Sequence, residues 1–322
     1  MARTVVAGLD GSPESRAAVM GAPPTPLRQW GRAAREAKLR GLPLKIVHVW
    51  EPVPEPMAQA PLLGPETLQH WTERSEMGAP PAEGWGRIPR ETAEGARMRH
   101  PGVQVTVEQL TGRPADVLAE DAELLVLGSR GLSGLGGFLI GSVGRSVLAH
   151  ARRPVVLVRA GEQAADEHEP DPVGIPSAAT GYRPVVLGLD PADPDDSVIG
   201  FAFDEATRRS AVLRVLYGWN LPPYYTYGLA ADPDYHNEII RQQSAALAEA
   251  LRPWRQKYPD VDVVEESRSG SAGNHLVDAS RDASLVVVGR RIRRGPVGLH
   301  IGPVTHAVLH HAAAPVAVVA HN

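Results

Sequence analysis

The sequence contains no cysteine among its 322 residues. Disulfide bonds, thiol nucleophiles and cysteine-based zinc sites are therefore excluded as sources of stability or chemistry. Charge of one sign is not in large excess either, because 33 Lys and Arg stand against 37 Asp and Glu and leave a formal net charge of −4. Such a balance lacks the overall positive field on which most nucleic-acid-binding proteins depend. We therefore expect no nucleic acid partner.

Long hydrophobic runs are also absent. No apolar stretch approaches the roughly 20 residues needed to cross a bilayer, and the opening MARTVVAGLDGS lacks the apolar core of a secretory signal. The sequence predicts no membrane segment, with the cytoplasm as the expected location. Apolar residues still make up 43% of the chain, which is enough to bury the cores of two domains of ordinary size.

Signatures of well-known hydrolytic sites are missing as well. The sequence has no Gly-x4-Gly-Lys-Ser/Thr loop, no Gly-x-Ser-x-Gly nucleophile turn and no His-Glu-x-x-His metal motif. His306 and His310 lie four residues apart on a predicted helix, next to His311, a spacing that suits a metal ion. No acidic partner has a matching spacing, so we interpret them as surface or interface histidines. We predict no metal site and no catalytic residue.

What the sequence does contain is a repeated alternation of strand and helix patterns. Short runs rich in β-branched residues predict buried strands at 3–10, 42–50, 103–110, 122–128 and 153–159, and again at 184–190, 211–219, 261–267, 284–289 and 315–319. Helical patterns lie between them, notably at 29–41 and from Gly141 onward. This alternation is typical of parallel sheets built from right-handed βαβ units. Residues 161–182, which are polar and rich in Pro and Gly, are interpreted as a linker.

The second set of elements repeats the first. At an offset of 161 residues, Gly128, Ile140, Gly141, Val143 and Pro154 align with Gly289, Ile301, Gly302, Val304 and Pro315. This internal duplication predicts two domains, at 1–160 and 183–322, on either side of the linker. The first copy alone carries two proline-containing interruptions, MGAPPTP at 20–26 and MGAPPAEGWGR at 77–87.

A glycine-rich segment follows the fourth predicted strand of the first copy, with the pattern Gly128-x2-Gly131-x9-Gly141-Ser142. Because glycine lacks a Cβ, its N–H can approach an oxyanion closely, and a helix that begins here adds the positive end of its dipole. The pattern favours a phosphate-binding loop at the carboxyl end of a strand, where open α/β sheets bind ligands. A flexible loop in which Ser142 only caps the helix is the alternative.

With these residues the chain resembles a tandem universal stress protein, which has two domains of that family in one polypeptide. The family's nucleotide motif, Gly-x2-Gly-x9-Gly-Ser/Thr after the fourth strand, is matched in full at 128–142, and VVAGLDGSPES, KIVHVWEP, GRPADVL and HARRPVVLV resemble further family segments. The resemblance implies two Rossmann-like or flavodoxin-like α/β domains. Each would hold a five-stranded parallel sheet in the order 3-2-1-4-5, flanked by helices.

The final strand of each copy would then lie at a sheet edge. Unprotected apolar edges invite pairing, so we expect the two domains to dock there as an intramolecular pseudo-dimer. Whole chains are expected to pair further as homodimers.

The resemblance implies ATP as the ligand, with or without Mg²⁺. Carried over to this chain, the contacts would come from Gly8, Asp10, Val49, Gly128, Ser129, Arg130, Gly131, Gly141, Ser142 and Val143. Asp10 and the backbone of Gly8 and Val49 would meet adenine or ribose, and the others the ribose and phosphates. Two of these residues have structural alternatives, because Asp10 can form an Asx turn or a helix N-cap and Arg130 can be merely solvated.

The second copy departs from the motif at two places. Ile292 stands in place of Gly131, and Pro303 stands in place of Ser142, so bulk is added while an N–H and a hydroxyl are lost. Its remaining candidates are Gly188, Asp190, Gly289, Arg290 and Gly302, with nearby arginines at 291, 293 and 294. The sequence predicts a weaker second site, or a degenerate copy that serves as the partner of the first.

These features predict an ATP-binding stress-response protein that senses or sequesters adenine nucleotide mainly through its N-terminal domain, and not an enzyme. A phosphate-binding loop without a placed water, base or arginine finger hydrolyses nucleotide slowly at most. The alternatives are a weak ATPase or nucleotidyl-transfer enzyme, and an interaction module whose glycine loops only shape a dimer surface. The aromatic segment WNLPPYYTYG (219–228) is interpreted as packing.

Overall fold

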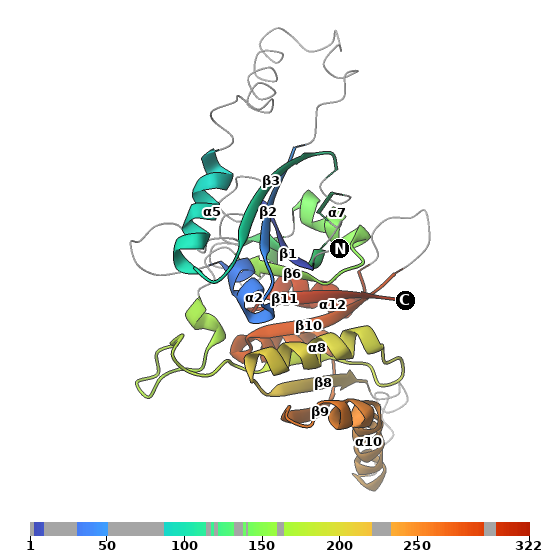
Figure 1. Cartoon of the computed structure of the whole chain (residues 1–322). Helices are drawn as coiled ribbons and strands as arrows, with labels where there is room; N and C mark the ends of the chain where they lie inside the picture. The colour runs from blue at the N-terminus through green and yellow to red at the C-terminus, as the bar shows by residue number, and fades with distance from the viewer. Residues whose placement is uncertain are drawn as a thin grey trace, which may run out of the picture.

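The chain folds into alternating strands and helices (Figure 1). The computed structural model describes residues 3–9, 31–50, 87–113, 117–118, 122–131, 138–139, 141–159, 164–220, 233–292 and 301–322. Asp10, the loop positions 132–137, most of both MGAPP segments and the aromatic segment beyond Asn220 lie outside the described residues.

Each half contains the elements that its sequence pattern predicts. The first half contains β1 (Thr4–Leu9), α2 (Arg32–Arg40), β2 (Leu44–Trp50), α5 (Arg87–Arg99), β3 (Val105–Thr111), β4 (Ala122–Gly131), β5 (Phe138–Leu139), α7 (Ser142–His150) and β6 (Val155–Arg159). A short 3-10 turn, η1 (Ala164–Glu167), lies in the connecting segment. The second half contains β7 (Val185–Gly188), α8 (Asp196–Arg209), β8 (Leu213–Trp219), α10 (Pro233–Lys257), β9 (Val263–Ser269), α11 (Ala272–Ala279), η2 (Ser280–Asp282), β10 (Leu285–Arg291), α12 (Pro303–His311) and β11 (Val316–His321).

The strands form one continuous sheet in the order β3-β2-β1-β4-β6-β11-β10-β7-β8-β9, with β5 paired to β4 outside this path. Neighbouring strands on this path are parallel within each half. Each half therefore has the order 3-2-1-4-5, which confirms the predicted fold class of two flavodoxin-like α/β units.

The two halves are joined through their last strands. Strands β6 and β11 pair antiparallel, with Val155 opposite Val318 and Leu157 opposite Val316. These strands, predicted to be edges where the domains dock, are therefore interior strands of the joint sheet, near the centre of Figure 1. The pairing covers two β-branched runs that would otherwise offer unpaired backbone groups to other chains.

Both faces of the sheet are covered, and each core continues across the junction. Because successive strand residues point to opposite faces, Val5 and Val185 lie in one buried cluster, and Val6 and Val186 lie in the other. Alanines of α2 and α5 and apolar residues of α8 and α10 cover the first face, while α7, α11 and α12 cover the second. The halves thus share their hydrophobic cores.

A ring of four charges is buried where α2 meets α8. Arg40 pairs with Glu36 on its own helix, and its Nη2 lies 2.5 Å from Glu205 Oε1 on the other helix. Arg209 repeats the arrangement, with Nη1 2.5 Å from Glu205 Oε2 and Nη2 2.5 Å from Glu36 Oε1. None of the four side chains is more than 4% exposed. The sequence behind the ring is a repeated Glu-Ala-x-x-Arg, at 36–40 and 205–209.

The connecting segment extends this ring. Glu167 of η1 is buried and pairs with Arg35, while its Oε2 lies 2.8 Å from Arg32 Nη1. Arg32 in turn places its Nε 2.5 Å from Glu36 Oε1 and donates from Nη1 to the carbonyl of Ser284 at 3.1 Å. Residues predicted to form a simple linker therefore contribute a buried carboxylate that contacts the first half.

The arginines keep the buried carboxyls ionised. Burial by itself raises the pKa of Glu36, but the charges of Arg209, Arg32 and Arg40 outweigh it and hold that pKa well below its ordinary value of 4.5. For Glu167 burial also raises the pKa, and Arg32 and Arg35 outweigh it, so the pKa is again lowered. Removing one member would leave a buried charge without compensation, which costs about 3–5 kcal/mol.

Positive and negative side chains alternate around the ring. Reversing the charges on one helix, or on both, therefore tests whether the four residues stabilise the fold together. Glu36→Arg with Arg40→Glu places like charges opposite both Glu205 and Arg209, and should lower the free energy of unfolding by about 3–5 kcal/mol. Glu205→Arg with Arg209→Glu should do the same. All four substitutions together restore the alternation between the helices and should recover the part of the loss that arises across the α2–α8 contact, while the like-charge contact of position 36 with Arg32 remains, as measured by chemical denaturation. A fourfold variant no more stable than either double variant would contradict the ring as a coupled unit.

Stability should also fall in acid. A carboxyl whose folded pKa is depressed contributes stability that is fully present above its unfolded pKa and is lost as the pH falls through its folded pKa. The free energy of unfolding should therefore decrease as the pH is lowered below about 4.5, as measured by urea denaturation over a pH series. The Glu167→Gln variant, less stable at pH 7, should show a shallower decrease. An unchanged pH slope in that variant would exclude Glu167 as a contributor.

Candidate functional site

The first-half candidates gather at the carboxyl ends of β1, β2 and β4. Gly8 pairs with Val47, and Gly128 pairs with Val158, near the ends of their strands. Val49 lies half-buried close to the end of β2. Since these strands are parallel, their ends lie along one edge of the sheet, which is where α/β proteins bind ligands. Asp10, which follows β1 directly, lies outside the described residues.

Gly8 also has a packing role. A Cβ at this position would lie 2.8 Å from Leu127 Cδ2 and 3.2 Å from Leu118 Cδ1. Gly188 of the second half is confined in the same way, because a Cβ there would lie 2.7 Å from Leu276 Cδ1. At both positions a Cβ would press against leucine methyl groups of the core beneath the sheet edge, so packing favours glycine whatever binds above it.

The β4–β5 ribbon turns the chain back beside β4. Arg130 pairs with Leu139 and Gly131 pairs with Phe138, antiparallel. Leu139, two residues before Gly141, therefore lies beside the carboxyl end of β4.

Helix α7 starts with open backbone. Gly141 is its N-cap, with φ −65° and ψ 172° and no side chain of its own to cap the first turn, and Ser142 is the first helical residue. Gly141 accepts the first helical bond from Arg145 N at 3.0 Å, whereas the N–H groups of the first turn have no acceptor within the helix. A Cβ at Gly141 would meet nothing within 4 Å, and Val143 is 36% exposed. An oxyanion can therefore approach these donors.

In the second half, all five candidates line one cavity of about 480 Å³ at the equivalent edge: Gly188, Asp190, Gly289, Arg290 and Gly302. This volume is within the usual range for small-molecule sites. A Cβ at Gly302, the N-cap of α12, would meet open space, as at Gly141. Pro303 occupies the first position of α12, and the Thr305 hydroxyl donates to the carbonyl of Gly289 at 2.9 Å.

Two of the arginines expected to attract phosphate in the second half have other partners. Arg290 is 6% exposed and donates from Nη2 to the carbonyl of Ala151, the C-cap of α7, at 2.7 Å. Burial lowers its pKa. Arg291 is more exposed and pairs with Asp193. The arginines at 293 and 294 lie outside the described residues.

Carboxylates line this cavity instead. Asp190 accepts from the backbone N–H of Ala192 at 3.0 Å, the Asx turn that was the alternative for its first-half counterpart. Asp195 caps α8 by accepting from Ser197 N at 2.9 Å. Partial burial raises the pKa of Asp195, and hydrogen bonds from Ser197 outweigh it, so the pKa is lowered and the carboxylate stays charged.

The sequence-based reasoning missed His321 of this cavity. Its Nδ1 lies 3.7 Å from Asp195 Oδ2, and a Cβ at Gly289 would lie 2.9 Å from its Nε2, so the ring fills the space beside that glycine. No local motif marks the residue. It reaches the site only because β11 pairs with β10, which sets His321 opposite Arg291.

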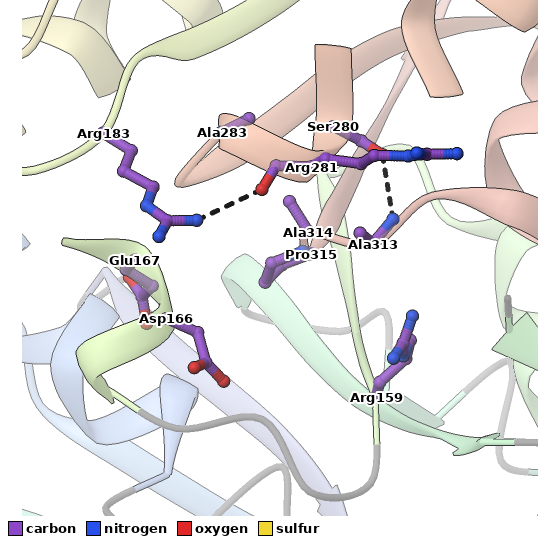
Figure 2. Close-up of a pocket in the computed structure, with 10 residues that line it drawn as sticks. All are labelled: Arg159, Asp166, Glu167, Arg183, Ser280, Arg281, Ala283, Ala313, Ala314 and Pro315. Atoms are coloured by element: carbon purple, nitrogen blue, oxygen red, sulfur yellow. Dashed lines mark hydrogen bonds between the residues drawn. The ribbon is translucent and has the colours of Figure 1, made fainter. Parts of the chain in front are cut away.

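A second cavity, of about 270 Å³, lies at the junction of the halves (Figure 2). Arg183 donates from Nη1 to the carbonyl of Arg281 at 3.1 Å and from Nε to the carbonyl of His168 at 2.8 Å. Ser280 Oγ accepts from Ala313 N at 2.8 Å. The lining also contains Arg159, Asp166 and Glu167, so charges of both signs face the space. These groups hold the connecting segment against the second half.

The predicted histidine cluster lies on α12. The rings of His306 and His310 are 4.3 Å apart. Burial lowers the pKa of His310, and the charges of His306, His311 and Arg145 lower it further. Arg145 belongs to α7, so the cluster lies where helices of the two halves approach each other. Within the described residues, no three His, Cys, Asp or Glu side chains are grouped to hold a metal ion.

Membrane insertion gains no support from the helices. Among the described residues, none of them combines the length and the apolar character that a bilayer crossing needs.

Comparisons with known proteins agree on one family. The sequence model of the Universal stress protein family matches residues 1–159 and 181–320. A universal stress protein of Mycobacterium tuberculosis (strain H37Rv) is 32% identical over 325 residues, which cover 98% of this chain and 96% of that protein. Another, from Mycolicibacterium smegmatis, is 30% identical over 322 residues, with coverage of 98% and 96%.

Solved structures share the fold over the whole chain. The crystal structure of a universal stress protein from Archaeoglobus fulgidus matches with a TM-score of 0.60 at 14% identity, covering 99% of this chain and 98% of that one. A functionally unknown protein from Pseudomonas aeruginosa PAO1 matches with a TM-score of 0.53 at 15% identity, covering 99% and 93%. At these identities the likeness concerns the fold alone.

Proposed function

Since the chain belongs to the universal stress protein family, with one copy of the family's domain in each half, we propose that it binds ATP through its first half. The bound nucleotide is sensed or sequestered as part of a stress response, and is not turned over as a substrate. The output is a shift in conformation or a contact with another protein.

One observation carries this proposal, namely the open backbone where α7 begins. The N–H groups of the first turn lack intrahelical acceptors, Gly141 has no side chain to cap them, and among the described residues a Cβ at Gly141 would meet nothing within 4 Å. Donors that converge on empty space at a positive helix end suit a phosphate group. Mg²⁺, where present, would arrive with the nucleotide, because the described residues offer no metal site of their own.

The proposal includes a poor second site. Pro303 lacks the N–H that the equivalent Ser142 supplies, and Arg290 is turned to the carbonyl of Ala151. Asp193 and Asp195 line the second cavity at positions where the first copy has Pro13 and Ser15. A triphosphate would meet these carboxylates there while Arg291 is already paired with Asp193, and like charges in close contact repel. We therefore expect one ATP per chain.

Placing the second half's residues at positions 131 and 142 of the first half should weaken ATP binding. Gly131→Ile with Ser142→Pro adds bulk and removes a donor, yet keeps α7 intact because proline is well accepted at the first helical position. Losing a hydrogen bond to a charged group costs about 1.5–3 kcal/mol, so affinity for ATP should fall by at least about tenfold in calorimetry. A double variant that binds like the parent would refute the site.

Matched substitutions in the second half are the control. Ile292→Gly with Pro303→Ser should leave affinity and stoichiometry unchanged, because the carboxylates and the position of Arg290 remain. The pair Gly141→Ala and Gly302→Ala adds a methyl group to open space in each half, and only the first should weaken ATP binding.

Radiolabelled ATP incubated with excess protein should stay intact, whereas steady release of phosphate would instead favour a weak ATPase.

A further inference from the structure

The helix that begins at the proposed nucleotide site is anchored at its other end. Helix α7 has nine residues, and Gly141, Val143 and Arg145 at its start are exposed. Val147 and Leu148, in its second half, are buried in the cluster that covers the second face of the sheet. The place of the N–H groups that would meet a phosphate therefore depends on how the last turns of α7 are held.

The second half of the chain supplies part of that anchor. Val147 and Leu148 belong to the same buried cluster as Val308 and Leu309 of α12 and Val316 of β11. A helix as short as α7 has little stability of its own in water, so its order and position follow from tertiary contacts. The core that positions α7 is thus built by both copies.

A guanidinium from the second half completes the anchor. Ala151 N donates to the carbonyl of Val147 at 2.8 Å and closes the helix, which leaves the carbonyl of Ala151 beyond the last helical hydrogen bond. Ala151 is 1% exposed, and a buried carbonyl needs a donor. Arg290 of β10, itself 6% exposed, supplies it from Nη2 at 2.7 Å. A cation at this end of a helix is also favoured by the helix dipole.

The internal repeat shows how the same position differs between the copies. At the offset of 161 residues Arg290 corresponds to Ser129, a candidate nucleotide contact of the first half. The reciprocal contact, from Arg159 to the carbonyl of Ala312 at 3.3 Å, reaches the C-cap of α12. Helix α12 begins with Pro303 and is not the proposed ATP site. Only the guanidinium of Arg290 therefore holds a helix whose other end would receive the nucleotide.

We propose that Arg290 is a positioning residue for the nucleotide site, through which the second half sets the ATP affinity of the first. Arg290 binds the C-cap carbonyl of α7 and thereby keeps the first turn of that helix ordered, about 13 Å away at 1.5 Å per residue. Without this contact a fraction of molecules has α7 frayed or displaced. The observed dissociation constant rises as the competent fraction falls. This inference rests on the proposed function.

The test begins with Arg290→Met, which keeps most of the apolar stem and removes the guanidinium. Affinity for ATP, measured by calorimetry on the full-length protein, should fall by about three- to tenfold. Arg290→Lys keeps a cation and a donor, so its affinity should lie between those of the parent and Arg290→Met. Circular dichroism establishes that each variant is folded.

Two controls separate positioning of α7 from general damage to the fold. Adenosine lacks the phosphates that α7 would receive, so Arg290→Met should leave its affinity unchanged, as measured by ligand-observed NMR, which detects weak binding. Arg159→Met removes the reciprocal guanidinium from the carbonyl of Ala312. It should leave the affinity for ATP unchanged, because α12 does not carry the ATP site.

The outcomes distinguish this inference from the proposed function. A parent protein that does not bind ATP would refute both. A parent that binds ATP, together with an Arg290→Met variant of equal affinity, would refute the positioning role alone. Equal losses of ATP and adenosine affinity in Arg290→Met would also overturn that role. So would an equal loss of ATP affinity in Arg159→Met, or an Arg290→Lys variant that binds ATP no better than Arg290→Met.

Discussion

The antiparallel pairing of β6 with β11 is the contact on which the rest of this architecture depends. It converts two five-stranded parallel sheets into one sheet and lets both hydrophobic cores run through the junction. It also fixes the orientation of the second half relative to the first. Because the halves run in opposite directions at this point, the carboxyl edge of the first sheet continues into the amino edge of the second. The carboxyl edge of each copy therefore lies beside the amino edge of the other.

Side-chain contacts across the junction are also related by an approximate two-fold symmetry. Arg290 donates to the C-cap carbonyl of α7, and Arg159 donates to the carbonyl of Ala312, the C-cap of α12, at 3.3 Å. Each half thus places a guanidinium at the negative end of the other half's last helix, which is favourable for the helix dipole. The buried Glu–Arg ring adds a second reciprocal contact farther along the interface. At the junction the two copies therefore make equivalent contacts, whereas the parts of the two halves that lie away from the junction differ.

Much of the fold could be predicted from the sequence because its signals are local. Continuous β-branched runs marked all the main strands to within a few residues, and Gly41 marked the end of α2, where φ is 62°. The order of strands came from the resemblance. The antiparallel register of β6 and β11 follows from neither, since it depends on how the second copy turns relative to the first.

The charged residues show why the site was harder to predict. Glu36 and Arg40 have the spacing of an ordinary solvated helix pair, and only their meeting with Glu205 and Arg209 makes them buried. Arg290 was expected to attract phosphate from its place after a strand, but its long side chain reaches the other half instead. The spacing of residues along the sequence indicates which side chains are neighbours on one helix or strand. The partners of Glu36 and Arg40 instead come from the second copy, at equivalent positions 169 residues later.

The same junction limits how whole chains can associate. The last strands of both copies are already paired with each other, so they are not available to a second chain. The outer strands of the described sheet are β3 and β9, and both carry charge: Glu108 pairs with Lys45 of β2, and Glu266 pairs with Arg214 of β8. Charged side chains on outer strands discourage edge-to-edge pairing. The last strands thus extend the sheet within one chain, and the charges on β3 and β9 disfavour these strands as the contact surface of a homodimer.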